Sequence, residues 1–233
     1  MLIPWSKLPI LTERTERDLN DFTIPIAYNN SRDAGERVFC WHPKTESSLF
    51  ISEDTVPAGV AHSLVRAVAD HAASLGVRVL RPDWEGTDPS PKDVEEWVSL
   101  MWLIYLDQRV PRCEPLVMLI PHYDRTVSTP ARAPRSRLVH DRLDQLVHGG
   151  PERNIYPVVS YGTDVVDEDG SVITSLSGIT RTYVGDGNTH VTLRDPEYRD
   201  RLGDALVFPG QGPGALTGYE MDLFPPDQIR RGF

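Results

Sequence analysis

Four short apolar runs along the middle of the chain have the length and composition of buried strands. They read SLFIS (48–52), VRVL (77–80), LVMLI (116–120) and NIYPVVSY (154–161). LVMLI is almost purely apolar, as expected for a central parallel strand that is covered on both faces. The pattern predicts a sheet whose strands are separated by longer connecting segments.

The connecting segments carry apolar residues at helical spacing. One helix is predicted from Thr55 to Leu75, and Gly76 suits its exit. Ser90 is placed to cap a second helix, with Asp93 completing a capping box. A third helix fits residues 135–148. Strands that alternate with helices in this way form parallel sheets, because each crossover returns the chain to the same end of the sheet.

These elements predict an α/β fold with a doubly wound parallel sheet of the flavodoxin type, in strand order 2-1-3-4-5. The predicted domains are an N-terminal extension (1–47), an α/β domain (48–165) and a β-rich C-terminal segment with an extended arm (166–233). DEDG (167–170) and GDGN (185–188) are hairpin-type turns, so an antiparallel β segment is expected after the α/β domain.

The same pattern predicts which side chains form the core. Apolar residues in the strands should be almost fully buried, and those on the inner faces of the first two helices should pack against them. The residues are Phe50, Val79, Leu116, Met118, Ile120, Val158, Leu64, Val68, Trp97 and Met101. FTIPIAY (22–28) and RVFCW (37–41) are expected as edge strands, since the first contains a proline.

Composition narrows the class of partner. The 233 residues carry a formal net charge of −10, which argues against binding to nucleic acid phosphates. The longest apolar run, WVSLMWLIYL (97–106), is shorter than the roughly 20 residues that span a bilayer. The two cysteines, Cys40 and Cys113, belong to no metal or disulfide motif. We expect a soluble cytoplasmic protein that binds neither nucleic acid nor membrane.

Several fragments match one family in their order and spacing. They are SLFISED (48–54), GVRVLRPDWEG (76–86), PLVMLIPHY (115–123) and NIYPVV (154–159). Residues 48–161 thereby resemble a Toll/interleukin-1 receptor (TIR) domain, which opens on an F-I-S strand, carries an acidic tryptophan-bearing loop, and has a strand ending near Ser-Pro-x-Tyr. Here Ile120 replaces that serine.

The resemblance implies two alternative functions in signalling or defence. Some TIR domains cleave the nicotinamide–ribose bond of NAD⁺ with a glutamate on the third helix, so NAD⁺ would be a substrate and no resident cofactor is implied. The corresponding stretch (136–146) has no glutamate, and Asp141 and Asp144 are the nearest acids for that role. Other TIR domains are non-catalytic adaptors or assembly components that self-associate or bind a protein partner.

Polar residues follow three of the predicted strands. Because the carboxyl ends of parallel strands meet at one edge, these residues are expected to line a ligand crevice there. The predicted ligand-binding residues are Ser52, Glu53, Asp54, Asp83, Trp84 and Tyr123. Trp84 or Tyr123 would stack on a planar ring of a small nucleotide, and a carboxylate would bind ribose hydroxyls. The alternative is that Asp54 caps a helix and the two aromatic residues cover the end of the sheet.

Histidines offer further alternatives, although no metal site is predicted outright. His122 and Asp124 have the spacing of two ligands in an iron-dependent oxygenase, with His190 as a third. His140, Asp144 and His148 share one face of the third predicted helix. That face would be either a zinc site or a solvated polar stripe.

Overall fold

The structure is a computed structural model and describes residues 22–28, 38–54, 60–84, 89–107, 114–123, 134–162, 164–166, 172–175, 188–194, 204–208 and 219–223. The strands are β1 (Ile24–Tyr28), β2 (Val38–Trp41), β3 (Leu49–Asp54), β4 (Arg78–Leu80), β5 (Leu116–Ile120), β6 (Ile155–Gly162), β7 (Asp164–Val166), β8 (Val172–Ser175), β9 (Thr189–Arg194), β10 (Asp204–Phe208) and β11 (Tyr219–Leu223). The helices are α2 (Pro43–Glu46), α3 (Val60–Ser74), α4 (Pro91–Asp107), α6 (Pro134–Gly149) and the 3-10 turn η2 (Pro151–Arg153).

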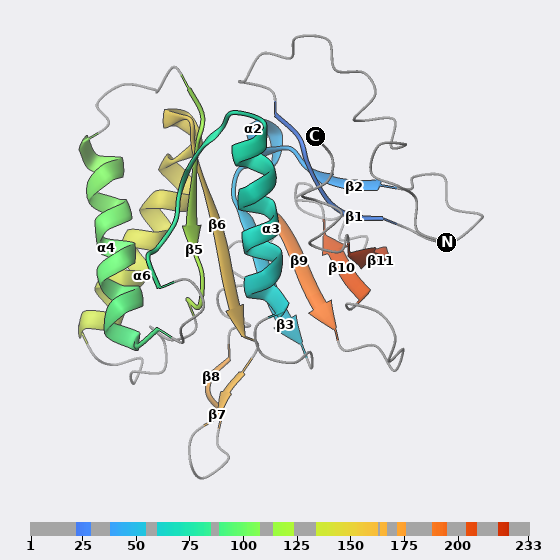
Figure 1. Cartoon of the computed structure of the whole chain (residues 1–233). Helices are drawn as coiled ribbons and strands as arrows, with labels where there is room; N and C mark the ends of the chain where they lie inside the picture. The colour runs from blue at the N-terminus through green and yellow to red at the C-terminus, as the bar shows by residue number, and fades with distance from the viewer. Residues whose placement is uncertain are drawn as a thin grey trace.

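Nine of these strands form one sheet in the order β2-β1-β11-β10-β9-β3-β6-β5-β4 (Figure 1). The strands from β9 to β4 are parallel, and the pairings from β2 to β9 are antiparallel. β7 and β8 form a separate antiparallel pair on either side of residues 167–170. The predicted fold class, a doubly wound parallel sheet with an antiparallel β-rich C-terminal segment, is confirmed.

The predicted strand order is wrong. It placed the first strand between the second and third, but β3 pairs with β6 on one side and β9 on the other. The connection through α3 carries the chain to β4 at the edge of the sheet, and β5 and β6 then return toward β3 one after another. Hydrophobic periodicity is a local property. It predicts each strand and helix, but it does not show how many strand positions the connection between two strands crosses.

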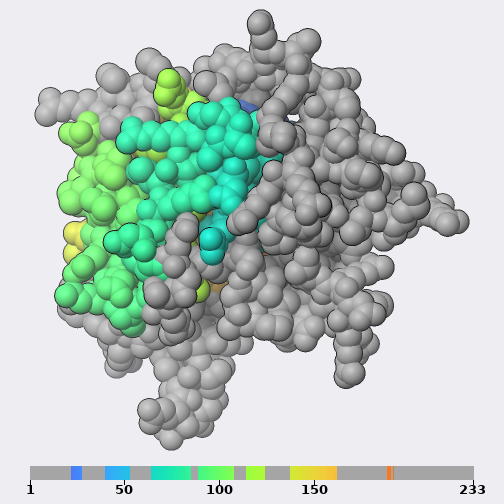
Figure 2. Space-filling view, viewed as in Figure 1, coloured from blue at the N-terminus to red at the C-terminus, as the bar shows by residue number. Residues whose placement is uncertain are grey.

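Helices cover the parallel strands on both faces. Leu49 and Ile51 of β3 share one core cluster with Leu64 and Val68 of α3. The intervening Phe50 belongs to a second cluster, which contains the buried residues of α4 and α6. This alternation follows from the two-residue period of a strand. Figure 2 shows the outer surfaces of α3, in teal, and of α4, in green.

The predicted core is largely confirmed. Eight of the ten residues are at most 4% exposed, namely Phe50, Leu64, Val68, Met101, Leu116, Met118, Ile120 and Val158. Val79 and Trp97 are only partly buried and pack against the two clusters from outside. Val79 lies on β4, the last strand of the sheet, where one side has no neighbouring strand. The indole Nε1–H of Trp97 donates a hydrogen bond to the Leu119 carbonyl at 2.6 Å.

The exit of α3 has the predicted glycine. Gly76 adopts a left-handed conformation with φ of 81°. The N–H of Val77 donates to the Ala72 carbonyl at 3.0 Å, and the N–H of Gly76 donates to the Ala73 carbonyl at 3.0 Å. These two bonds form a Schellman motif, which satisfies helix-end carbonyls and turns the chain into β4.

Both ends of the described chain contribute to the antiparallel part of the sheet. β2 is the edge strand that the sequence predicts, whereas β1 lies one position inside and pairs with β11. Pro25 of β1 sits beside a register irregularity, which is where a proline is tolerated within a sheet. β11 falls between segments predicted as a loop and an arm, so its existence was missed. Within the described residues no helix is long and apolar enough to cross a membrane.

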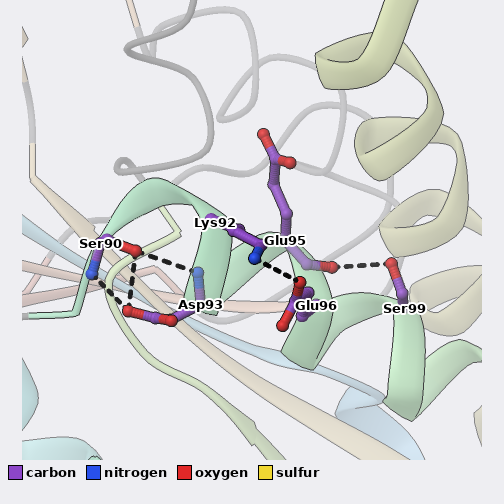
Figure 3. Close-up of polar contacts among 6 residues, drawn as sticks. All are labelled: Ser90, Lys92, Asp93, Glu95, Glu96 and Ser99. Atoms are coloured by element: carbon purple, nitrogen blue, oxygen red, sulfur yellow. Dashed lines mark hydrogen bonds and ion pairs between the residues drawn. The ribbon is translucent and has the colours of Figure 1, made fainter.

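The start of α4 carries the capping box that the sequence predicts (Figure 3). The N–H and hydroxyl of Ser90 donate to Asp93 Oδ2 at 2.9 and 2.8 Å, and the N–H of Asp93 donates to Ser90 Oγ at 3.3 Å. The Ser90 hydroxyl and backbone N–H hold the pKa of Asp93 below its ordinary value, because both hydrogen bonds favour the ionised carboxylate.

Replacing Ser90 with alanine should therefore raise the pKa of Asp93 partway toward its ordinary value, since the backbone donor remains. An NMR titration of the Asp93 carboxyl carbon measures this, with Ser99→Ala as a control that should leave Asp93 unchanged. The depressed pKa means that the ionised carboxylate stabilises the folded state above the ordinary pKa, and this contribution disappears as the pH falls through the folded-state value. An unchanged Asp93 pKa in the Ser90 variant would contradict the assignment.

Candidate functional site

The carboxyl ends of β3 and β6 form the switch point of the doubly wound sheet. The chain leaves the carboxyl end of β3 for α3 on one face of the sheet and leaves that of β5 for α6 on the other face, and β6 lies between these two strands. Connections that diverge in this way leave a crevice at the ends of the strands, where ligands bind in such folds. The register places Ser52 beside Tyr161 and Glu53 beside Gly162 at this point.

The turn after β5 is fixed against the same end of β6. The N–H of Tyr123 donates to the Ser160 carbonyl at 2.8 Å, and the N–H of His122 donates to Ser160 Oγ at 3.3 Å. His122 has φ of 57°, an uncommon conformation for a residue other than glycine. Tyr123 is only 1% exposed, and its hydroxyl lies 3.3 Å from Nδ1 of His140. In this conformation its ring is part of the core and offers no face for stacking.

The loop with Asp83 and Trp84 lies at a different place along the edge. β4 is three strand positions from β3, or about 14 Å at the usual spacing of strands. The Trp84 ring packs edge-on against Trp97 of α4, with 5.8 Å between ring centroids. Asp83 is exposed. Thus the structure brings Ser52 to the switch point and places Trp84 against α4, and ligand binding by the predicted residues stays a prediction.

The predicted acids of the third helix are both on α6. Asp141 is exposed, and Asp144 lies 3.3 Å from Nε2 of His148 across one helical turn. Among the residues that the structure describes, no group of three or more histidine, cysteine or acidic residues could hold a metal. Asp124 lies outside the described residues, as does the side chain of His190. Of the two interpretations of His140, Asp144 and His148, a zinc site or a solvated polar stripe, the second therefore remains.

Sequence reasoning missed the residues that β9 brings to the edge. β9 pairs with β3 along its whole length, and the register places Arg194 beside Asp54 at the carboxyl ends of the two strands. The register thus adds a basic residue type to an edge to which β3 contributes Glu53 and Asp54. Nothing local in the sequence around Arg194 could have indicated it, because its position depends on a pairing between distant segments.

The start of α3 adds a second positive feature. α3 begins at Val60, six residues after β3 ends at Asp54, and its first turn contains no acidic residue. Its unpaired N–H groups and helix dipole favour an anion at this end. The switch point therefore combines a helix N-terminus, an arginine on the neighbouring strand and two acids on β3 itself.

Comparison with known proteins finds solved structures of similar fold. No protein-family model matches the sequence, and no curated protein matches it. The cytoplasmic domain of the Thermomonospora curvata type VII secretion ATPase EccC is similar in structure, with a TM-score of 0.57, 10% identity and coverage of 95% of this chain. The pCW3 conjugation coupling protein TcpA, in its monomer form with ATPγS, has a TM-score of 0.55, 9% identity and coverage of 97% of this chain.

A third structure, of EccC ATPases 2 and 3 in complex with a signal sequence peptide, has a TM-score of 0.54, 10% identity and coverage of 92% of this chain. This chain spans 27% of the EccC cytoplasmic domain, 75% of TcpA and 44% of the EccC fragment with the peptide. At such low identity these likenesses show the fold alone, an α/β architecture shared with these ATPase structures.

These findings overturn the TIR resemblance and the functions that it implied. The similar structures are ATPases, and β3 is flanked by β6 and β9 where the predicted order required the second and third strands. NAD⁺ cleavage by Asp141 or Asp144 and the non-catalytic adaptor are therefore wrong interpretations, as is the oxygenase with His122, Asp124 and His190. The matching fragments were the apolar strands and polar loops that doubly wound sheets have in common.

Proposed function

We propose that this protein is a nucleotide-binding domain of the P-loop ATPase fold that holds a nucleoside triphosphate at the β3–α3 turn without hydrolysing it. The observation that carries the proposal is the position of β3, which lies inside the parallel strands and leads directly into α3. P-loop proteins bind phosphates at such a strand–turn–helix junction, where backbone N–H groups meet the anion. TcpA, which is similar over 97% of this chain, was solved with ATPγS.

The sequence of the turn departs from the P-loop signature G-x-x-x-x-G-K-[ST]. With Gly59 taken as the second glycine, Asp54 stands at the first glycine, Val60 at the lysine and Ala61 at the serine or threonine. The lysine of the signature reaches the β- and γ-phosphates, and the hydroxyl binds Mg²⁺. This chain therefore lacks the two side chains that hold the γ-phosphate and the metal.

Among the residues that the structure describes, those at the ends of β5 and β6 do not replace these groups. Pro121, His122 and Tyr123 follow β5, and β6 ends at Tyr161 and Gly162. None of these is a carboxylate that could hold Mg²⁺ in the way an acidic residue does in P-loop enzymes. Phosphoryl transfer depends almost entirely on positioning and on neutralising charge. We therefore expect binding that is independent of Mg²⁺, with no hydrolysis.

Arg194 is the basic residue that the register brings to the turn, beside Asp54. We propose that it partly replaces the missing lysine by neutralising the phosphates from the side of β9, while the N-terminus of α3 contributes backbone donors. An arginine at this register position would also offset the charge of Glu53 and Asp54, which would otherwise repel a triphosphate at short range.

Calorimetric titration with ATPγS, in Mg²⁺ and in EDTA, tests this function directly. We expect saturable binding whose affinity differs by less than about threefold between the two buffers, because Ala61 stands where the signature has the hydroxyl that binds the metal. ATP incubated with the protein should release no more phosphate than ATP in buffer alone. No binding at millimolar ATPγS would overturn the proposal, and Mg²⁺-dependent turnover would overturn the claim that hydrolysis is absent.

Two substitutions locate the binding site. Arg194→Ala should weaken ATPγS binding about tenfold, as expected when a charge-assisted contact is lost. The matched control is Arg78→Ala, because Arg78 is an exposed residue at the opposite, amino end of β4. The double variant Val60→Lys with Ala61→Thr should bind ATPγS more tightly and in a Mg²⁺-dependent manner. Equal effects of the two arginine variants would show that the site lies elsewhere.

A further inference from the structure

The turn after β5 has a strained backbone at the carboxyl edge of the sheet. Three described residues other than glycine have a positive φ, namely Ser47, His122 and Asn154. Ser47 and Asn154 are the C-cap residues of the short helices α2 and η2, and a positive φ is common at the end of a helix. His122 follows β5 and ends no helix. Strain of this kind clusters at functional sites, and it persists only where the surrounding structure holds it.

Ser160 of β6 holds the turn with two hydrogen bonds. Its hydroxyl oxygen accepts from the N–H of His122 at 3.3 Å, and its carbonyl accepts from the N–H of Tyr123 at 2.8 Å. Because Ser160 is only 2% exposed, water has little access to the position of this hydroxyl. Ser160 therefore supplies the bonds that keep His122 at its positive φ of 57°.

Ser160 also belongs to the face of the sheet that α3 covers. Val158, two residues earlier on β6, packs in the same cluster as the buried residues of α3, and strand residues two apart share a face. On the neighbouring strand Ser160 pairs with Ile51 of β3, next to the switch point. Tyr123, by contrast, packs in the cluster that contains the buried residues of α4 and α6. The turn is therefore fixed on both faces of the sheet, beside the strand that leads into the proposed nucleotide turn.

We propose that Ser160 is a positioning residue of the nucleotide site, which holds the turn of His122 and Tyr123 as a rigid wall of the crevice at the ends of β3 and β6. This inference rests on the nucleotide binding proposed above. A wall that is already in its binding conformation spares the ligand the cost of ordering it. Without the Ser160 hydroxyl, histidine at position 122 would leave its unfavourable positive φ. Glycine at that position would stay, because glycine adopts a positive φ without strain.

Calorimetric titration of three variants with ATPγS tests this role. Ser160→Ala should weaken binding about fivefold, as expected when one hydrogen bond that organises a site is lost. Ser160→Ala combined with His122→Gly should bind within about twofold of the wild type, because glycine keeps the turn in place without the hydroxyl. Ser48→Ala is the matched control and should bind as the wild type does. Ser48 is likewise buried, but it precedes the amino end of β3, at the opposite edge of the sheet.

Amide hydrogen exchange gives a second measurement that needs no ligand. The Tyr123 amide should exchange about tenfold faster in Ser160→Ala than in the wild type, since local opening becomes easier, and the glycine double variant should restore its protection. Circular dichroism melts establish that each variant is folded.

The possible outcomes separate this proposal from the nucleotide site itself. Unchanged ATPγS affinity in Ser160→Ala, or a loss that His122→Gly does not recover, would overturn the positioning role. A wild-type protein that binds no ATPγS would overturn the proposed function and the positioning role together. The expected exchange pattern of the Tyr123 amide would then identify the ligand, and not the restraint of the turn by Ser160, as the part that failed.

Discussion

Replacing Phe50 with alanine is expected to lower the free energy of unfolding by about 3 to 5 kcal/mol. Phe50 is the second residue of β3 and is fully buried, and it pairs with Val159 of β6 and His190 of β9. Its ring lies in the cluster that joins the sheet to α4 and α6. Because domains are stable by only about 5 to 15 kcal/mol, this single cavity would remove a large part of the total.

Urea denaturation followed by circular dichroism measures this loss. Leu103→Ala provides the control, since Leu103 is 55% exposed and its truncation leaves no internal cavity. Its effect should stay within about 0.5 kcal/mol, as is usual for surface positions. If Phe50→Ala cost less than about 1 kcal/mol, the position of β3 at the centre of the core would be refuted.

Replacing Gly150 with alanine is expected to cost about 3 kcal/mol, although only one methyl group is added. The new Cβ would lie 2.7 Å from the Ile155 carbonyl oxygen and closer still to the Leu146 carbonyl oxygen. Both oxygens belong to the backbone. The Gly150 N–H donates to the Leu146 carbonyl and the Ile155 N–H donates to the Gly150 carbonyl, each at 2.9 Å. The junction between α6 and β6 therefore cannot relax without losing hydrogen bonds.

The neighbouring Gly149 is the matched control for this substitution. The three heavy atoms nearest to a Cβ at Gly149 all belong to the Tyr105 side chain, whose ring lies 4.2 Å from the guanidinium of Arg153. The end of a side chain can move, so Gly149→Ala should cost clearly less than Gly150→Ala in the same urea experiment. Equal losses for the two variants would show that the clash with backbone oxygens does not decide stability at this junction.

Much of the secondary structure of the α/β part could be predicted because its causes are local. The strands from β3 to β6 follow apolar runs, and the Ser90–Asp93 capping box follows from two residues three positions apart. Gly76 ends α3 because it tolerates a positive φ. Burial of Phe50 and Met118 follows from the same apolar runs.

The strand order could not be predicted, since it depends on which distant segments pair. The apolar pattern of SLFIS fits equally well beside VRVL or beside NIYPVVSY, and the structure selects the latter. The TIR resemblance failed for the same reason, because it rested on fragments without their spatial order. β11 was not predicted, although its sequence YEMDL alternates in polarity, because glycine- and proline-rich segments border it.

The wrong strand order changed which residues surround the candidate site, but it did not change the edge of the sheet where the site lies. The carboxyl ends of parallel strands share one edge in any order, so the prediction of a site after Ser52 does not depend on which strand lies beside β3. Its neighbours do depend on the pairing. Trp84 follows β4 at the far edge of the sheet, whereas Tyr161 of β6 and Arg194 of β9 lie on the two strands that pair with β3.

The pairing of β1 with β11 has a consequence for biosynthesis. Ala27 is paired with Leu223, so β1 leaves the ribosome long before its partner strand exists. Ile24 and Ile26 are fully buried beneath α3 in the folded protein. Strand β1, which carries them, cannot pair with β11 until most of the chain has been translated. Contacts between such distant segments form slowly. A nascent chain stopped before β11 would leave unpaired edges on both β1 and β10, and such edges are templates for aggregation. Deleting the five residues of β11 should therefore harm yield in cells far more than their number implies.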